Sequence, residues 1–275
     1  MSHENRRHTI ATKRVVLELP GADAVIVRHD VPFAPVDGER LTMDIYYPAG
    51  PATHERTPAV LFVTGYSDDG MRKVVGCNAK DMASYISWAQ LVAASGLVAI
   101  TYTTRRPATD VHKVLDFVRQ HAEPLGIDEE RIGIWSCSGN VPNALSMCMN
   151  ADPYVRCAAL CYGYMLDLEG STSVADAAAR FRFVNACAGK SVEDLASNLP
   201  LFIARAGRDE MPHLNDTIDR FVAEAVKHNL PVTVVNHHTG PHAFDVVDDS
   251  EASRGVVKQI LAFMQFHLKK SAESV

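Results

Sequence analysis

The amino-acid sequence predicts an α/β fold in which a mostly parallel central sheet is flanked by helices. From residue 59 onward, short runs of consecutive apolar residues alternate with stretches that carry apolar side chains at helical spacing. Strands that are apolar on both faces and are each followed by a helix are typical of parallel sheets. The chain has 275 residues, of which 47% are hydrophobic. This is enough to bury the core of one domain spanning residues 1–275.

The N-terminal part has a different pattern. Residues 1–13 are polar and charged, and we expect them to be mobile. Short alternating runs follow at residues 15–19, 24–27 and 41–47, separated by the turn-forming pairs Pro20-Gly21 and Asp37-Gly38. Alternation bounded by such turns predicts antiparallel strands at one edge of the sheet.

The parallel part of the sheet follows in regular order. Its strands are expected at residues 59–63, 97–102, 132–135, 157–162, 199–204 and 231–235. The intervening helices are predicted from apolar stripes within residues 85–93, 111–118, 141–149, 218–226 and 257–268. Residues 165–198 break the rhythm, because they are too many for a simple crossover. We expect this segment to form a small helical lid over the C-terminal edge of the sheet, where ligands bind in such folds.

Charge and composition argue against several functions. A net charge of −6 does not favour a nucleic-acid or membrane partner. No apolar run approaches the roughly 20 residues of a membrane span, and no secretory signal is visible. The six cysteines are therefore expected to be reduced thiols of a cytoplasmic protein. The oligomeric state is left open, with a homodimer as one candidate.

The most informative stretch is residues 131–140, where an apolar run stops at small residues and a helix follows. A serine at such a corner is exposed at the top of the sheet, and the helix N-terminus directs backbone N–H groups at charge that develops there. Ser138 occupies this corner. The usual pattern is G-x-S-x-G, but Ser136 and Asn140 replace both glycines here. Asn140 is expected to be tolerated because asparagine accepts unusual backbone angles.

Two other strand ends carry an acid and a base. Asp209 follows the strand at 199–204, just after Gly207, and His242 lies in the loop after the last strand. A nucleophilic serine needs a base to accept its proton and an acid to orient that base. Ser138, His242 and Asp209 are therefore the predicted catalytic residues.

Rival residues stand close to both partners. Glu210 is the alternative acid, and His237 and His238 are the alternative bases. The i, i+4 spacing of His238 and His242 would suit a metal ion on a helix, but Gly240-Pro241 prevents that helix. Neither a metal ion nor another cofactor is expected.

Taken together, these motifs resemble the α/β-hydrolase superfamily and, within it, the dienelactone-hydrolase-like serine esterases. The resemblance covers about residues 40–268 and depends on the order serine, acid, histidine, on residues 131–135 before the corner, on the turn 207–209 and on the loop 240–244. It implies an α/β-hydrolase fold. It also implies an oxyanion hole formed by two backbone N–H groups, here those of Tyr66 and Gly139, with Gly65 allowing the backbone to approach the substrate.

Dienelactone hydrolases themselves use a cysteine nucleophile, and Cys137 stands beside Ser138. If Cys137 were the nucleophile, Trp135 would lie two positions before it, where crowding at the corner requires a small residue. If Ser138 is the nucleophile, Ser136 lies there instead. The bulky indole therefore favours Ser138.

Five further residues are candidates for the substrate pocket, each with a second interpretation. Arg105 follows a strand end and either binds a substrate carboxylate or is a solvated loop charge. Tyr162 and Tyr164 end a strand beneath the expected lid and either line the pocket or pack. Phe181 and Phe183, within the lid, either form the wall of an acyl pocket or pack into the core.

The predicted function is hydrolysis of carboxylic esters or lactones of small to medium size by a serine hydrolase. The substrate would be a small molecule, and no cofactor would be needed. Acyl transfer on the same three residues is one alternative. A catalytically inactive binding protein on a hydrolase scaffold is another, motivated by the two missing glycines.

Overall fold

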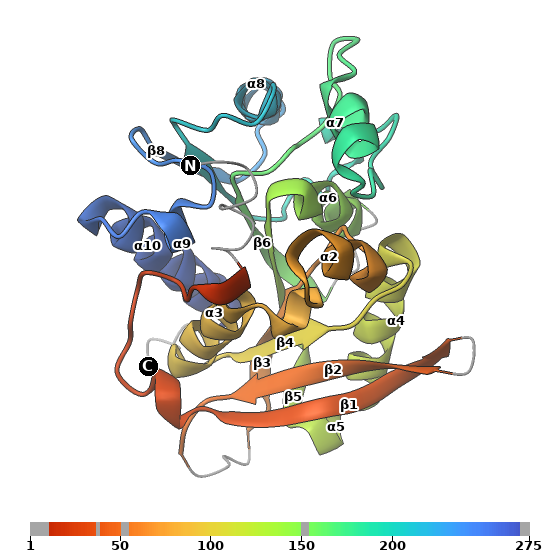
Figure 1. The fold of residues 1–275 in the computed structure, drawn as a ribbon, viewed down its shortest axis with the longest axis vertical. Coiled ribbons are helices and arrows are strands. Elements are labelled where there is room, and N and C mark those ends of the chain that lie inside the picture. Colours follow the sequence, from red (N-terminus) through yellow and green to blue (C-terminus); the bar gives the residue numbers. More distant parts are fainter. Residues whose placement is uncertain (1–10, 37–38, 51–54, 150–153, 270–275) are drawn as a thin grey trace.

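The computed structural model describes residues 11–36, 39–50, 55–149 and 154–269 (Figure 1). The expected mobility of the N-terminus concerns mainly residues 1–10, which lie outside the described residues. From Val15 onward the backbone forms hydrogen bonds with distant parts of the chain. The Val15 N–H donates to Ser87 Oγ at 2.9 Å, and the Val16 N–H donates to the Asp245 carbonyl at 2.8 Å.

One sheet organises the described residues, with the strand order β1-β2-β4-β3-β5-β6-β7-β8. The strands are β1 Ile26–Val36, β2 Glu39–Tyr47, β3 Thr57–Phe62, β4 Val98–Tyr102, β5 Ile127–Cys137, β6 Val155–Cys161, β7 Leu201–Ala206 and β8 Val232–His237. Strand β2 is antiparallel to both of its neighbours, whereas every other pair is parallel. The prediction of a mostly parallel sheet with an antiparallel edge is confirmed.

Helices cover both faces of this sheet (Figure 1). One layer contains α3 Ala83–Ala94 and α10 Glu251–Leu268, and the other contains α4 Pro107–Gln120, α6 Val141–Met149 and α8 Leu214–Lys227. Strand β3 explains the two layers, because its side chains alternate. Val60 and Phe62 pack with the first layer, whereas Ala59 and Leu61 pack with the second.

The remaining helices are short. They are α2 Asp68–Val75, α5 Ala122–Leu125, α7 Ser173–Phe181 and α9 Phe244–Val247, with 3-10 turns η1 Ala22–Ala24, η2 Ala79–Asp81, η3 Ser138–Asn140 and η4 Val192–Asp194. Helix α7 and turn η4 lie in the segment expected to be a lid.

Two predictions for the N-terminal edge were wrong. Residues 15–19 are not a strand, although Val15 and Leu17 are buried. Their alternation reflects packing against side chains of the helical layer rather than pairing in the sheet. Strand β1 instead extends over Ile26–Val36, and its register shifts between Arg28 and Val31 and again between Pro32 and Ala34. Such irregularities disrupt the alternation of apolar and polar side chains, so a prediction based on that alternation does not detect the edge strand.

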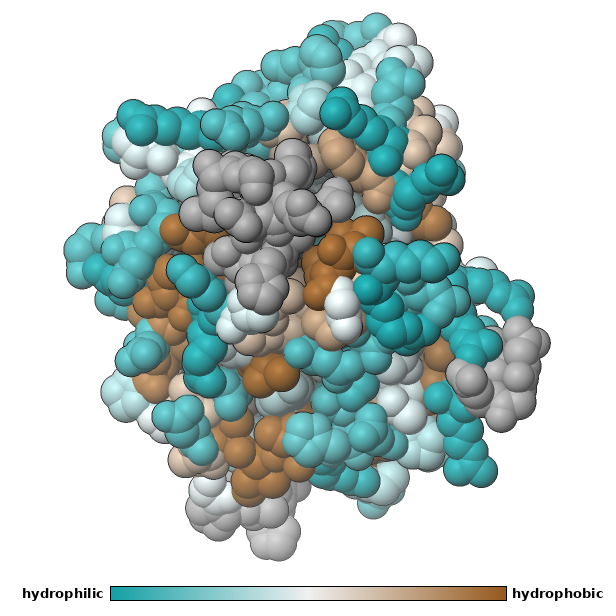
Figure 2. Space-filling view, in the orientation of Figure 1, coloured by the Kyte–Doolittle hydropathy of each residue, from teal (hydrophilic) through white to brown (hydrophobic). Residues whose placement is uncertain are grey.

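The space-filling view shows hydrophilic side chains over most of the rim of one face and apolar side chains nearer its middle (Figure 2). Over the described ranges, no helix is both long and apolar enough to traverse a lipid bilayer. All six cysteines lie in these ranges, and none of them forms a disulfide.

Candidate active site

Ser138 stands at the point where β5 ends and η3 leads into α6. Its backbone φ is 58°, a left-handed conformation that costs a non-glycine residue energy. Two positions earlier, Ser136 is fully buried, and its Oγ donates to the Val63 carbonyl at 3.0 Å. A small side chain thus occupies the buried position two residues before Ser138.

Asn140 has a role that differs from the expected one. It is not among the residues with positive φ, so unusual backbone angles are not the reason it replaces glycine. Its Oδ1 accepts the Gly65 N–H at 2.8 Å, and its Nδ2 donates to the Tyr85 hydroxyl at 3.0 Å. The side chain therefore ties the corner to the loop that follows β3.

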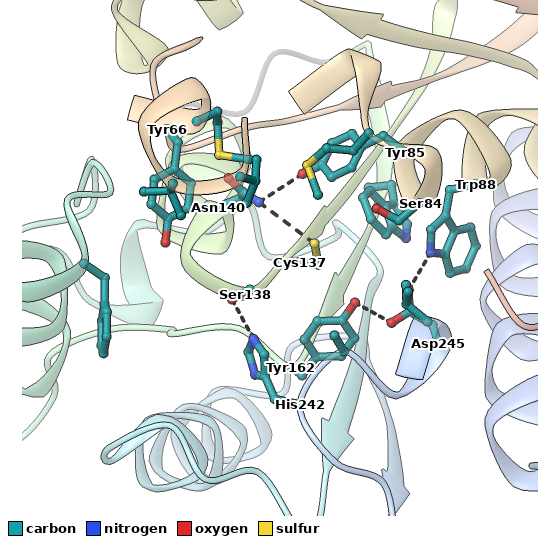
Figure 3. Close-up of a pocket in the computed structure, with 18 of the residues that line it drawn as sticks. Tyr66, Ser84, Tyr85, Trp88, Cys137, Ser138, Asn140, Tyr162, His242 and Asp245 are labelled. Atoms are coloured by element: carbon teal, nitrogen blue, oxygen red, sulfur yellow. Dashed lines mark hydrogen bonds between the residues drawn. The ribbon is translucent and has the colours of Figure 1, made fainter. Parts of the chain in front are cut away.

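The structure brings Ser138, His242 and Asp209 together, and Figure 3 shows the contact between Ser138 and His242. Ser138 Oγ lies 2.9 Å from His242 Nε2, and His242 Nδ1 lies 2.7 Å from Asp209 Oδ2. The Asp209 side chain is 0% exposed and that of His242 is 12% exposed. With Nδ1–H donating to the carboxylate, Nε2 is left as the acceptor for the serine hydroxyl.

Gly207 explains how the acid loop reaches the base loop. A Cβ at this position would lie 2.6–2.8 Å from the backbone of His238, so only glycine fits. The Gly207 N–H donates to the His237 carbonyl and the Arg208 N–H to the Gly240 carbonyl, each at 2.9 Å. These two bonds hold the loops after β7 and β8 side by side.

The rival residues lie elsewhere. Glu210 is exposed, and so is His238. His237 is buried with its Nε2 2.9 Å from Ser253 Oγ. The thiol of Cys137 lies 3.9 Å from Asn140 Nδ2. Burial, together with the charge of Asp245, raises the pKa of Cys137 to about 12, so the thiolate that a cysteine nucleophile needs does not form near neutral pH.

The loop after β3 packs directly on the corner. The Tyr66 N–H, which the resemblance assigns to an oxyanion hole with that of Gly139, lies 3.3 Å from Thr64 Oγ1. A Cβ at Gly65 would lie 2.8 Å from the Gly139 carbonyl oxygen and 3.0 Å from Asn140 Cα. The close approach of Gly65 is therefore to the corner itself.

We expect Gly65→Ala to lower ester turnover about 100-fold, the scale of losing one oxyanion donor. The new methyl group meets backbone atoms of Gly139 and Asn140, so the loop must move away from the corner and carry the Tyr66 N–H with it. Turnover of a short p-nitrophenyl ester and the melting temperature would be measured. The matched control is Gly255→Ala in α10, where a Cβ meets nothing within 4 Å. A folded Gly65→Ala variant with full activity would contradict this placement.

Asp68 anchors the other end of the same loop. Its Oδ2 accepts the Thr104 N–H at 2.7 Å, and its own N–H donates to the Thr104 carbonyl at 2.8 Å. Its Oδ1 is buried and has no hydrogen-bond partner among the described residues. Burial raises the pKa of Asp68 to about 6.

An acid with a raised pKa in the folded state destabilises the fold where it must be ionised. The penalty is absent below the unfolded pKa, near 3.8, and is complete above the folded pKa, near 6. When the pH rises from about 4 to about 8, the unfolding free energy of Asp68→Asn should therefore increase by about 2–3 kcal/mol relative to that of the unmodified protein. Urea titrations at both pH values measure this. A difference that does not change with pH would contradict it.

A cavity of about 160 Å³ opens beside Ser138 and His242. Figure 3 shows most of the side chains that line it. They are predominantly apolar or aromatic: Tyr66, Met71, Val74, Val75, Met82, Ser84, Tyr85, Trp88, Trp135, Cys137, Ser138, Asn140, Tyr162, Phe181, Met211, His242, Ala243, Asp245 and Val246.

Of the five predicted pocket residues, Tyr162 and Phe181 line this cavity, whereas Tyr164, Phe183 and Arg105 do not. Phe183 is 5% exposed and stacks on Tyr164 with ring centroids 5.5 Å apart. The Tyr164 hydroxyl donates to the Pro212 carbonyl at 3.0 Å. The Arg105 N–H donates to Asp110 Oδ2 at 2.9 Å. Packing accounts for Tyr164 and Phe183, whereas the role of the Arg105 side chain stays a prediction.

Sequence reasoning missed Asp245, which is 2% exposed in α9. The Tyr162 hydroxyl donates to its Oδ1 and Trp88 Nε1 donates to its Oδ2, each at 2.6 Å (Figure 3). Tyr162 has a strained φ of 35°, and its ring stands edge-on to His242 at 5.2 Å. A carboxylate within the apolar run 243–247 was the available signal.

No family model and no curated protein sequence matches the chain. Solved structures do match it over most of its length. A bacterial heroin esterase has a TM-score of 0.65 at 16% identity, covering 93% of this chain and 88% of that one. Brefeldin A esterase, a bacterial homologue of human hormone-sensitive lipase, has a TM-score of 0.71 at 16% identity, covering 97% and 83%.

A thermophilic esterase from the Planctomycetes species Thermogutta terrifontis has a TM-score of 0.66 at 19% identity, covering 92% of this chain and 97% of that one. Identities this low carry information about the fold alone. Together with the sheet order and the helices on both faces, they show that the chain has the α/β-hydrolase fold.

Proposed function

We propose that this chain is a serine hydrolase that cleaves carboxylic esters or lactones of small to medium size. The observation that carries this proposal is the hydrogen-bonded series from Ser138 through His242 to Asp209, located beside an apolar cavity. Several solved structures that share its fold are named esterases, which supports the same chemistry. That the chain is a dienelactone-hydrolase-like esterase in particular is part of the proposal.

The proposed reaction uses these residues in two steps. Ser138 Oγ attacks the ester carbonyl carbon while its proton passes to His242 Nε2, and Asp209 stabilises the imidazolium that forms. The N–H groups of Tyr66 and Gly139 hold the oxyanion. As the tetrahedral intermediate collapses, the C–O bond to the leaving alcohol breaks and His242 protonates that oxygen. Water, deprotonated by His242, then attacks the acyl carbon. The bond from this carbon to Ser138 Oγ breaks, His242 returns the proton to Oγ, and the acid leaves.

A fluorophosphonate probe tests whether Ser138 is an activated nucleophile. We expect it to label Ser138, and a panel of p-nitrophenyl esters of increasing chain length, run beside lactones, to be hydrolysed. Adding an alcohol acceptor distinguishes acyl transfer, because a transferred acyl group would appear as a new ester rather than as free acid. An unlabelled Ser138 with no turnover on any ester would leave the inactive-scaffold alternative.

We also propose that residues 165–198 form a lid that affects substrate choice. The segment contacts the active-site elements at several points: the Val184 N–H donates to the Gly65 carbonyl at 2.8 Å, and Cys187 Sγ lies 3.0 Å from the Pro142 carbonyl oxygen. Phe181, at the end of α7, lines the cavity. A lid that excludes water strengthens the contacts to the oxyanion.

Substitutions of the two phenylalanines in this segment should have different effects on substrate choice and on stability. Phe181→Ala should shift the preferred acyl length with little change in melting temperature, because its ring is half-buried and borders the cavity. Phe183→Ala should instead cost about 3–5 kcal/mol of stability, the usual price of emptying a buried aromatic position. The ester panel and thermal unfolding measure both effects. If Phe181→Ala left the preference for acyl chain length unchanged, the proposed role of the lid in substrate choice would be contradicted.

A further inference from the structure

Asp245 places a buried carboxyl group at the wall of an otherwise apolar cavity. Burial raises the pKa of Asp245, and the hydrogen bonds from Tyr162, Trp88 and its own backbone N–H, together with the nearby His242, offset only part of this effect. Tyr162 and Trp88 are neutral donors, and they occupy two of the roughly four acceptor sites of a carboxylate. When Asp245 is ionised, neither of these neutral donors neutralises its negative charge.

The surroundings do not compensate that charge. Among the described residues that line the cavity there is no lysine or arginine. A second carboxylate, Asp209, lies behind His242 with its side chain 0% exposed. Two buried acids thus lie in this region, Asp209 bonded to the imidazole and Asp245 bonded to Tyr162 and Trp88, and charge interactions are strong where water is excluded. A substrate group with a positive charge would be stabilised here, and one with a negative charge would be repelled.

The other walls suit a cation of a particular kind. Trp88, Trp135, Tyr85 and Tyr162 contribute aromatic rings to the cavity. Aromatic rings beside a carboxylate are the usual means of binding ammonium groups, because the negative face of each ring attracts the cation. The volume of about 160 Å³ is comparable with that of a cavity of about 150 Å³ that takes up benzene. A trimethylammonium group with a short linker is of similar size.

We propose that this cavity binds an ammonium-bearing part of the substrate, so that the enzyme prefers esters whose alcohol or acyl portion carries a positively charged nitrogen. The preference for charge depends on Asp245 and the aromatic walls. The consequence for turnover rests on the proposed ester hydrolysis, whereas the binding of the cation does not.

Choline and its neutral analogue, the alcohol in which a tert-butyl group replaces the trimethylammonium group, test the binding directly. They have nearly the same shape and differ in charge. The chain has two tryptophans, and both Trp88 and Trp135 line the cavity, so intrinsic fluorescence reports binding without any turnover. We expect choline to bind at least about tenfold more tightly than the neutral alcohol.

Asp245→Asn is the informative variant. An asparagine can accept from Trp88 through Oδ1 and donate to the Tyr162 hydroxyl through Nδ2, so the shape and both hydrogen bonds can be kept while the charge is lost. The ratio of the two dissociation constants should fall toward one. The matched control is Asp249→Asn, which removes the same charge from an exposed side chain four positions later. It should keep the original ratio.

The same comparison is made on rates, with acetylcholine against its tert-butyl analogue and against an ester that carries a carboxylate. We expect kcat/KM to rank cation above neutral above anion. Equal affinity for choline and the neutral alcohol, or an unchanged ratio in a folded Asp245→Asn variant, would overturn the inference. If that variant does not fold, the ranking of the three unmodified ligands still decides.

The outcomes separate the two proposals. Hydrolysis of p-nitrophenyl acetate without any preference for the cation would overturn this inference and leave the proposed function intact. Preferential choline binding by a protein whose Ser138 is not labelled and that cleaves no ester would overturn the proposed function and support the ammonium site.

Discussion

Ser138→Ala is expected to abolish ester hydrolysis, with a loss of roughly a millionfold in kcat, the scale seen when a serine protease loses its nucleophile. Ser138 Oγ is the atom bonded to His242 Nε2, and its strained backbone holds it at the corner between β5 and α6. Steady-state kinetics on p-nitrophenyl acetate, with titration of active sites by a fluorophosphonate, would measure the loss.

Cys137→Ala is the control for this substitution. Its thiol is held protonated by burial, which raises its pKa to about 12, and it contacts Asn140 rather than His242. We expect this variant to keep most of the activity, apart from a small change caused by the altered cavity wall. If Cys137→Ala were inactive and folded while Ser138→Ala retained turnover, the nucleophile would be the cysteine.

Asp209→Asn should lower kcat by about four orders of magnitude without unfolding the protein. An asparagine can direct its NH₂ group at His242 Nδ1, which places the imidazole proton on Nε2. That nitrogen would then donate to Ser138 instead of accepting its proton. The bond from the Met211 N–H, 2.9 Å from Asp209 Oδ1, can be kept by the amide oxygen, so the loop should remain in place.

Glu210→Gln serves as the matched variant, because it removes the adjacent carboxylate from an exposed side chain. It should be nearly fully active. Circular dichroism would verify that both variants are folded before their rates are compared. Full activity of a folded Asp209→Asn protein would reassign the acid, and a matching loss in Glu210→Gln would identify the replacement.

The local pattern of the sequence determined the architecture and the placement of the three central residues. Apolar runs of strand length followed by helical stripes predict parallel strands, and the C-terminal ends of parallel strands meet at one edge. Ser138, Asp209 and His242 each follow such an end, which is why a one-dimensional pattern could place them together. The pattern failed at β1, where prolines and register shifts disturb the alternation.

Contacts between distant residues were decided only by the tertiary structure. Trp88 and Asp245 are 157 positions apart and share a hydrogen bond, yet nothing local in either segment indicates the other. The same holds for Asn140, whose side chain reaches Gly65 across 75 positions. Phe181 and Phe183 are two residues apart and carry the same side chain. Only the packing of the folded chain shows that Phe181 lines the cavity and that Phe183 is buried. Periodicity reports which face of an element is apolar, whereas the partner that covers that face depends on how the whole chain folds.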